Sequence, residues 1–352
     1  MLAQIASRVL LVGLALGCSK SPQSKPQAST PQQVTPRQSS SPHAKLQATD
    51  ELTFTGMCDA SGGVPLDERY FVVADDEDNV LRAYDTTAPG PPVWSVDVSS
   101  AIGVFAKRKK AGKPAPETDI EAATRVGELA FWMTSHGRNS SGKLKRERLR
   151  LFATSVPKAG QPLGVVGKPY EHLLEDFLAE PRLERFGLRA AAELAPKAPG
   201  GLNLEGMTAR REGGVWVGFR NPIPEGKALL VPLLNPEQLI QGEKAVLGEP
   251  QQLDLGGYGV RAISSQGGRY LILAGSFDGS GTTRLYEWDG KGAAQVVAGA
   301  ALAGLNGEGF FSPGGKRVLV LSDDGTVLID GEECKGLDDV GKKRFRARWV
   351  EP

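Results

Sequence analysis

Five stretches of the chain share one pattern of apolar and polar positions. Each has a polar residue ahead of a pair of small residues, then a turn with glycine or acidic residues, then an apolar strand that ends in a polar tip. The stretches span residues 58–79, 119–139, 202–222, 258–279 and 305–325. Short apolar runs bounded by such turns predict antiparallel hairpins.

The spacing inside the five hairpins is constant. The leading polar residue and the tip are fifteen residues apart in Ser61–Asp76, Glu121–His136, Glu205–Arg220, Arg261–Ser276 and Glu308–Asp323. Successive hairpins are 60, 84, 56 and 47 residues apart. Another strand-like run follows each one: NVLRAYD, RLRLFATSV, KALLVPLLN, TTRLYEWDG and GTVLIDG. Three or four strands per unit at this period predict an all-β fold, a β-propeller.

Five blades are readable, and the longest step leaves room for a sixth. That step contains YEHLLEDFLAEPRLERFGLRAAAEL, in which one helical face holds Leu173, Leu174, Phe177 and Leu178. We expect a short helical insert at about 170–195, with Pro181 separating two helices. The insert either caps a mouth of the propeller or replaces a divergent blade. Residues 52–55, LTFT, are expected to pair with a strand near 345–350 and close the ring.

The hairpin geometry predicts a polar mouth. In a propeller the first strand of each blade lines the channel and the second runs back, so each leading residue meets its tip at one end. The candidate ligand-binding residues are Asp76, Asp119, Glu121, His136, Arg138, Asn139, Asn203, Glu205, Arg220, Asn221, Arg261, Glu308 and Asp323. A rigid polar hollow is a binding-site hypothesis. Pairs such as Glu205–Arg220 and Glu121–His136 could equally be structural ties between strands.

Two kinds of ligand fit this set. Carboxylates that crowd a channel repel one another unless a cation intervenes, and the candidates are Arg261 and a calcium ion. Alternatively, the loop that holds His136, Arg138 and Asn139 lies near Arg220, and arginines with amides suit a phosphate or a carboxylate. Further along that loop, we interpret Lys145, Arg146 and Arg148 as solvated basic residues.

Composition and motifs limit the chemistry. The net charge of +1, from 42 basic and 41 acidic residues, gives no support to nucleic-acid binding. The three histidines are too scattered for a zinc site, and the sequence has no GxSxG motif. The catalytic residues, if any, stay unassigned.

The N-terminus predicts export. Basic Arg8 precedes an apolar run, 9–17, that is too short to span a bilayer, and LVGLALGC ends in Cys18. This resembles a bacterial lipoprotein signal, so we expect a signal peptide at 1–18, a lipid such as palmitate on Cys18, a disordered Ser/Pro/Gln linker at 19–50 and the propeller at 51–352.

The expected location is therefore the cell envelope. The lipid would hold the chain to a membrane on the periplasmic side, and Ser19, in place of an aspartate, favours the outer membrane. An ordinary secretory signal would instead give a secreted protein. In that compartment Cys58 and Cys334 either form a disulfide that joins the two ends of the domain or stay as separate buried thiols.

Several long blocks resemble the bacterial domain-of-unknown-function family 3616. They include GMCDASGGVPLDERYFVVADDEDNVLRAYD, DIEAATRVGELAFWMTSHGRN, GGLNLEGMTARREGGVWVGFRNP and LILAGSFDG, within about 56–290. The resemblance implies no established activity. Its blocks fall on Asp59, Asp75, Asp76, Glu77, Asp119, Glu121, Ser135, His136, Arg138, Asn139, Asn203, Glu205, Arg220 and Asn221. The NLEGM…GGVWVG pattern is also similar, by analogy only, to phytase-like and esterase-like secreted propellers.

From the sequence we therefore expect a lipid-anchored envelope propeller that binds a small anionic ligand or an envelope protein at one polar mouth. The alternative is a metal-assisted hydrolase of phosphates or esters.

Overall fold

The computed structural model describes residues 49–105, 115–156, 161–298 and 302–352. The expected signal peptide, Cys18 and the linker up to residue 48 lie outside the described residues. No helix in the described ranges is long and apolar enough to cross a membrane.

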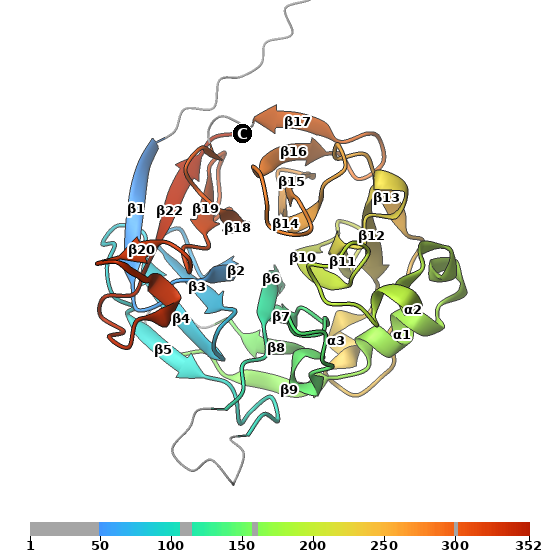
Figure 1. Cartoon of the computed structure of the whole chain (residues 1–352), viewed down its shortest axis with the longest axis horizontal. Helices are drawn as coiled ribbons and strands as arrows, with labels where there is room; N and C mark the ends of the chain where they lie inside the picture. Colours follow the sequence, from blue (N-terminus) through green and yellow to red (C-terminus); the bar gives the residue numbers. More distant parts are fainter. Residues whose placement is uncertain (1–48, 106–114, 157–160, 299–301) are drawn as a thin grey trace, which may run out of the picture. The chain divides into compact units, whose positions relative to one another are not determined.

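Five four-stranded antiparallel sheets surround a central axis, as Figure 1 shows. The first blade contains β2 (Ala60–Pro65), β3 (Tyr70–Asp75), β4 (Val80–Asp85) and β5 (Trp94–Asp97). The second contains β6 (Ile120–Val126), β7 (Leu129–Thr134), β8 (Leu151–Ser155) and β9 (Val165–Tyr170). The third contains β10 (Asn203–Ala209), β11 (Val215–Asn221), β12 (Ala228–Leu233) and β13 (Gln251–Leu253). The fourth contains β14 (Gly259–Gln266), β15 (Arg269–Gly275), β16 (Arg284–Trp288) and β17 (Gln295–Ala298).

The two ends of the domain share the fifth blade and close the ring. Its order is β18 (Gly307–Phe311), β19 (Val318–Ser322), β22 (Arg344–Val350) and β1 (Thr49–Thr55). Phe54 pairs with Phe345 across β1 and β22, so the predicted closure by 52–55 is confirmed. The fold is thus a five-bladed β-propeller, and the described residues contain no sixth blade.

One predicted strand is wrong. The run GTVLIDG does not form the third strand of the fifth blade, because β22 pairs with β19 and fills that position. The run instead contributes to a small hairpin of β20 (Leu328–Ile329) and β21 (Glu332–Glu333), which we call the clip.

A disulfide joins Cys334, just after the clip, to Cys58, and their Cα atoms are 5.9 Å apart. Of the two states considered for these cysteines, the structure has the disulfide.

Small residues near the axis have a steric cause. A Cβ atom on Gly309 would lie 1.8 Å from the carbonyl oxygen of Ser61, and one on Gly62 would lie 2.7 Å from the carbonyl carbon of Ala122. The inner strands of neighbouring blades therefore approach too closely for larger side chains. This explains why a small residue follows the leading polar residue in each hairpin.

The insert in the longest step covers part of the outside of the ring (Figure 1). It contains α1 (Leu173–Ala179), the 3₁₀ helix η3 (Pro181–Phe186) and α2 (Leu188–Ala191). Phe177 packs on Phe219 of β11 with ring centroids 5.6 Å apart. The remaining short helices are η2 (Arg146–Arg148), η4 (Pro224–Gly226), α3 (Pro236–Leu239) and η6 (Cys334–Gly336).

Candidate functional site

A β-bulge occurs at the same place in all five inner hairpins. On the first strand of each hairpin, the pairing with the second strand skips one residue in four blades and two residues, Ser61 and Gly62, in the first blade. A bulge turns a side chain away from the regular alternation of a strand. The skipped polar side chains, which we call the inner ring, are Ser61, Glu121, Glu205, Arg261 and Glu308. All five are buried.

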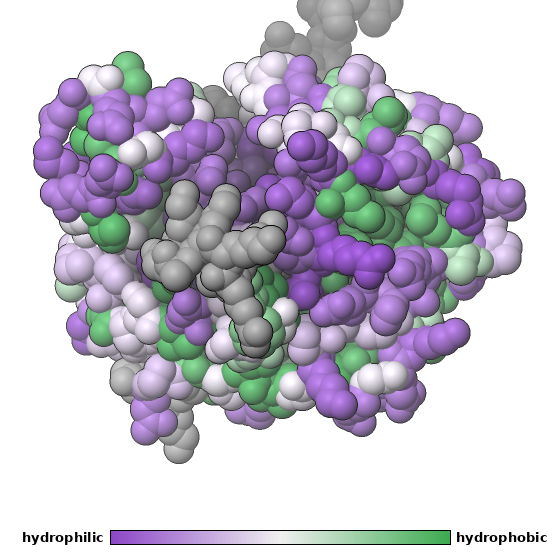
Figure 2. All heavy atoms as spheres, turned by 60° about the horizontal axis from the view of Figure 1, so that its bottom comes forward, coloured by the Kyte–Doolittle hydropathy of each residue, from purple (hydrophilic) through white to green (hydrophobic). Residues whose placement is uncertain are grey.

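A cavity of about 640 Å³ lies at the mouth above the inner ring. Nine acidic residues line it: Asp59, Asp76, Glu77, Asp119, Glu121, Glu205, Asp278, Glu308 and Asp323. Five basic residues line it: Arg148, Lys197, Arg220, Arg261 and Lys335. The upper part of Figure 2 shows a hydrophilic hollow between two raised parts of the surface. With nine acids against five bases, the cavity suits a positively charged group better than an anion.

Nine of the thirteen residues predicted for the mouth line this cavity. They are Asp76, Asp119, Glu121, Asn203, Glu205, Arg220, Arg261, Glu308 and Asp323. The other four, His136, Arg138, Asn139 and Asn221, are not among the lining residues.

His136 lies at the end of the hairpin but is buried away from the cavity. Its Nδ1 is 2.7 Å from the carbonyl oxygen of Thr134, and its Nε2 has no hydrogen-bond partner. Burial lowers the pKa of His136 to about 4, so the ring is neutral. No hydrogen bond joins His136 to Glu121 among the described residues, so the suggested tie between them is wrong.

Two of these four residues, Arg138 and Asn221, form hydrogen bonds that fix the chain beside the cavity. Arg138 Nε donates to the carbonyl oxygen of Ala192 at 2.8 Å, and Arg138 also pairs with Glu193. Asn221 Nδ2 donates to the carbonyl oxygens of Pro196 and Ala198 at 2.8 Å each. Their partners belong to the chain after α2, and residues 195–198 of that chain border the cavity.

Asn139 stabilises its own loop, since its Oδ1 accepts hydrogen bonds from the Lys143 backbone at 2.8 Å and the Ser141 hydroxyl at 2.9 Å.

Arg148 is a site residue that the sequence interpretation missed. Its side chain is 12% exposed and donates to Asp119 at 2.8 Å and to Glu117 at 2.7 Å, so the assignment to a solvated loop is wrong. The reason is the turn η2, which brings residue 148 back to the mouth, where its carbonyl oxygen accepts from the His136 backbone. Lys197 and Lys335 also line the cavity, and no local pattern marks them, because Lys197 lies in the chain after the insert and Lys335 lies beside the clip.

Two arginines neutralise one side of the inner ring. Arg220 Nη1 lies 2.5 Å from Glu205 and 3.5 Å from Glu308, and Arg261 Nη2 lies 2.7 Å from Glu308. Arg261 is therefore the carboxylate partner that the sequence suggested, and Glu205–Arg220 is a structural pair. Burial opposes the ionisation of Glu308, but Arg261 and Arg220 outweigh it and lower its pKa to about 2. We call this set the arginine side.

The opposite side holds Asp76, Asp119 and Glu121, and we call it the acidic side. Glu121 Oε2 and Asp76 Oδ1 are buried and have no hydrogen-bond partner. Burial, then repulsion from Glu205 and Asp119, raises the pKa of Glu121 well above its usual range. Burial also raises the pKa of Asp119 to about 6, although Arg148 opposes this.

These carboxylates are close enough to share an ion. Candidate ligand atoms of Asp76, Asp119 and Glu121 all lie within 4.8 Å of one another. Two further groups meet the same criterion, Asp59–Asp76–Glu77 and Glu121–Glu205–Glu308. The residues therefore fit a hard, oxygen-preferring cation.

Two carboxyl groups between the two sides share a proton. Burial and the neighbouring Asp323 raise the pKa of Asp59 to about 9, and the two side chains are hydrogen bonded. Burial raises the pKa of Asp323 to about 6. At neutral pH the Asp59 carboxyl therefore keeps its proton and donates it to Asp323.

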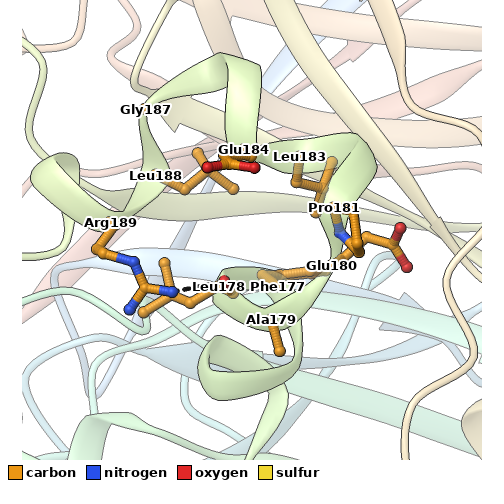
Figure 3. A pocket seen from close by; sticks show the side chains of 10 residues that line it. All are labelled: Phe177, Leu178, Ala179, Glu180, Pro181, Leu183, Glu184, Gly187, Leu188 and Arg189. Carbon is orange, nitrogen blue, oxygen red and sulfur yellow. Dashed lines mark hydrogen bonds between the residues drawn. The ribbon is translucent and has the colours of Figure 1, made fainter.

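A second cavity, of about 260 Å³, lies within the insert (Figure 3). Buried Phe177, Leu183 and Leu188 line it. Arg189 points to the carbonyl oxygen of Leu178 and donates to it at 3.0 Å. The one arginine of its lining is already bonded within the insert, so this cavity does not offer the cluster of charged groups that lines the mouth.

Comparison with known proteins gives a family match and distant folds. Residues 167–301 match the family described as "Protein of unknown function (DUF3616)". This range holds the insert with the third and fourth blades, and hence Glu205, Arg220 and Arg261. It does not include Asp76, Asp119 or Glu121. No curated protein matches the chain.

Similar solved structures share little sequence. A PQQ-bound aldose sugar dehydrogenase from Streptomyces coelicolor is 12% identical, with a TM-score of 0.44, over 87% of this chain and 97% of that one. Glutaminyl cyclase from Myxococcus xanthus is 13% identical, with a TM-score of 0.45, over 87% and 96%. Virginiamycin B lyase from Staphylococcus aureus is 7% identical, with a TM-score of 0.35, over 82% and 80%.

Proposed function

We propose that this protein is a ligand-binding propeller of the cell envelope, and that its mouth cavity takes a small polar ligand that brings positive charge. The observation that carries this proposal is the set of buried carboxylate oxygens without partners at the cavity, on Asp76, Glu121 and Glu205. A buried charge without a partner is costly, so a ligand that neutralises it binds favourably.

A free anion is a poorer ligand for this cavity. Arg220 and Arg261 already contact Glu205 and Glu308, and Arg148 contacts Asp119. An anionic ligand would therefore bind together with a cation, with Lys197 and Lys335 at the rim as its further partners.

The test is a thermal-shift panel on the full chain. The panel holds divalent chlorides, choline, spermidine, phosphate and sulfate, each alone, and phosphate again with each divalent chloride. We expect cations to raise Tm and the anions alone to leave it unchanged, because binding to the folded state stabilises it. A shift by anions alone, or no shift by any member of the panel, contradicts the proposal.

Metal-assisted hydrolysis of a phosphate or ester is the second candidate. It is favoured by the three overlapping carboxylate groups, which could hold a cation and still leave a carboxylate free as a base. Chromogenic phosphomonoester and carboxylic ester substrates, with calcium and with chelator, separate the two functions. Turnover that requires the cation and is lost in Asp76→Asn supports the hydrolase. Cation binding without turnover supports the binding protein.

We also propose that the chain works outside the cytoplasm, attached through lipid on Cys18. The disulfide between Cys58 and Cys334 supports this location, because such bonds persist in oxidising compartments. Labelled palmitate fed to expressing cells should enter the protein, and Cys18→Ser should abolish the label and release the chain from the membrane fraction. Label in the Cys18→Ser variant contradicts the anchor.

A further inference from the structure

We propose that Asp76, Asp119 and Glu121 form a binding site for one calcium ion at the junction of the first and second blades. This inference rests on the proposed function, since it names the positive charge that the cavity receives. Asp76 follows β3 of the first blade, whereas Asp119 and Glu121 lie at the start of β6 in the second. The ion would therefore link two blades.

The geometry suits calcium. The three ligand atoms lie within 4.8 Å of one another. Calcium binds oxygen at about 2.3–2.6 Å, so its ligand oxygens lie at most about 5 Å apart. Asp76 comes from one blade and Asp119 with Glu121 from the next, and calcium accommodates such mixed ligand sets more readily than magnesium, which demands near-octahedral geometry.

Unpartnered atoms are an independent indication of a ligand here. Glu121 is 7% exposed, and its Oε2 has no hydrogen-bond partner although it faces the cavity. Asp76 Oδ1 is also buried and also has no hydrogen-bond partner. Buried polar atoms are almost always hydrogen bonded, so two free carboxylate oxygens in one cluster require an explanation, and a bound ion is a recognised one.

Charge balance also points to a divalent ion. When all three are ionised, as calcium ligands are, the carboxylates carry −3. Arg148 divides its single positive charge between Asp119 and Glu117, so at least two negative charges remain for the ion to neutralise. Arg220 does not add to this balance, because it pairs with Glu205 and Glu308 on the arginine side. The rest of the coordination sphere would face the cavity, where water or the acidic group of a ligand could complete it.

The test uses the full chain freed of metal with chelator and titrated with calcium chloride by calorimetry, with Tm measured in parallel. We expect one ion per chain and a calcium-dependent rise in Tm. Glu121→Gln and Asp76→Asn should each weaken calcium binding by at least about 100-fold, because losing even a residue that only supports a metal ligand costs about 10–100-fold.

Asp278→Asn is the matched control. It makes the same chemical change in the same cavity, but Asp278 is held by its own loop through Ser276 and Ser280. Its calcium affinity should stay within about threefold of the wild type, because longer-range charge effects across solvent are screened. Circular dichroism checks that each variant is folded. If Glu121→Gln does not fold, Asp76→Asn decides.

Three results overturn the inference: no heat and no Tm shift with millimolar calcium, unchanged affinity in both triad variants, or equal losses in Asp278→Asn. If calcium fails while spermidine or choline raises Tm, the cavity binds organic cations and the proposed function stands without the metal site. If all cations fail, both proposals fall.

Discussion

The arginine side and the acidic side of the mouth are built on the same backbone and differ in charge. Glu205 and Glu308 on one side, and Glu121 on the other, all occupy bulge positions and all are buried. Arg220 and Arg261 form ion pairs with the first two, whereas no arginine or lysine of the described residues pairs with Glu121. The repeated bulge thus fixes where a side chain points, and the residue types around it decide whether its charge is balanced.

Removing an arginine should have the largest effect. In Arg220→Ala, Glu205 and Glu308 lose a buried partner, which typically costs about 3–5 kcal/mol of stability. Denaturant unfolding measures the loss. Arg269→Ala is the control, because Arg269 and its partner Glu287 are 62% and 34% exposed, and such exposed pairs contribute about 0–1 kcal/mol. Equal losses in the two variants would show that the arginine side is not a buried pair network.

The pH dependence of stability should be strong in the metal-free protein. In the folded protein burial raises the pKa of Asp59 to about 9 and that of Asp75 to about 7, whereas an aspartate in the unfolded chain has a pKa of 3.8. Both groups therefore bind their protons more tightly in the folded state. The free energy of unfolding is therefore highest in acid and falls as pH rises from about 4 to about 9, by about 1.4 kcal/mol per pH unit for each proton involved.

Asp59→Asn sharpens this prediction. It removes one of these titrations, so its unfolding free energy should exceed that of the wild type above about pH 7 and change less steeply. Denaturant unfolding in chelator across this pH range measures both. A wild-type profile that rises with pH contradicts the burial of protonated carboxyl groups at the mouth.

Glu121→Gln should act in the opposite sense to Arg220→Ala. Without metal, Glu121 must either take up a proton on folding or be buried as a repelled charge, and an amide avoids both costs, so we expect a gain of about 1–2 kcal/mol at neutral pH. Unfolding in chelator tests the sign. A loss of stability would mean that Glu121 has a partner and that the acidic side is already balanced.

The smallest effect is expected at Arg138. Its partner Glu193 is 73% exposed, so Arg138→Ala should cost about 1 kcal/mol or less. Because Arg138 does not line the cavity, the Tm response to cations should match that of the wild type. A variant that lost its response to phosphate would restore the anion-binding hypothesis for the loop.

The fifteen-residue spacing made the fold and most of the site predictable. Each inner hairpin has a bulge at its leading residue, and the residues paired just before the bulge are close to fifteen apart: fourteen in Ile120–Thr134 and fifteen in Gly307–Ser322. The small residue after each leading residue also helped to identify the repeat. Larger side chains are excluded there because the inner strands of neighbouring blades approach closely around the axis.

The remaining site residues depend on contacts that local sequence does not encode. His136 sits at a tip position, but its backbone has a positive φ of 54° and its ring bonds to Thr134, so it turns from the mouth. Arg148 and Lys335 reach the cavity only through η2 and through the segment after the clip. The run GTVLIDG reads as a strand, yet a strand from the C-terminus takes its place, because pairing partners follow from the whole topology.

The closure of the ring determines how the domain resists a pull from its N-terminal side. Tension transmitted along the chain before residue 49 reaches the hydrogen bonds between β1 and β22 first, at the outermost edge of the fifth blade. If that strand peels away, the next fixed point is Cys58, which is covalently held to Cys334. Mechanical load on a tether would therefore detach a single edge strand and stop there, before it reached β2 and the acid-lined pocket.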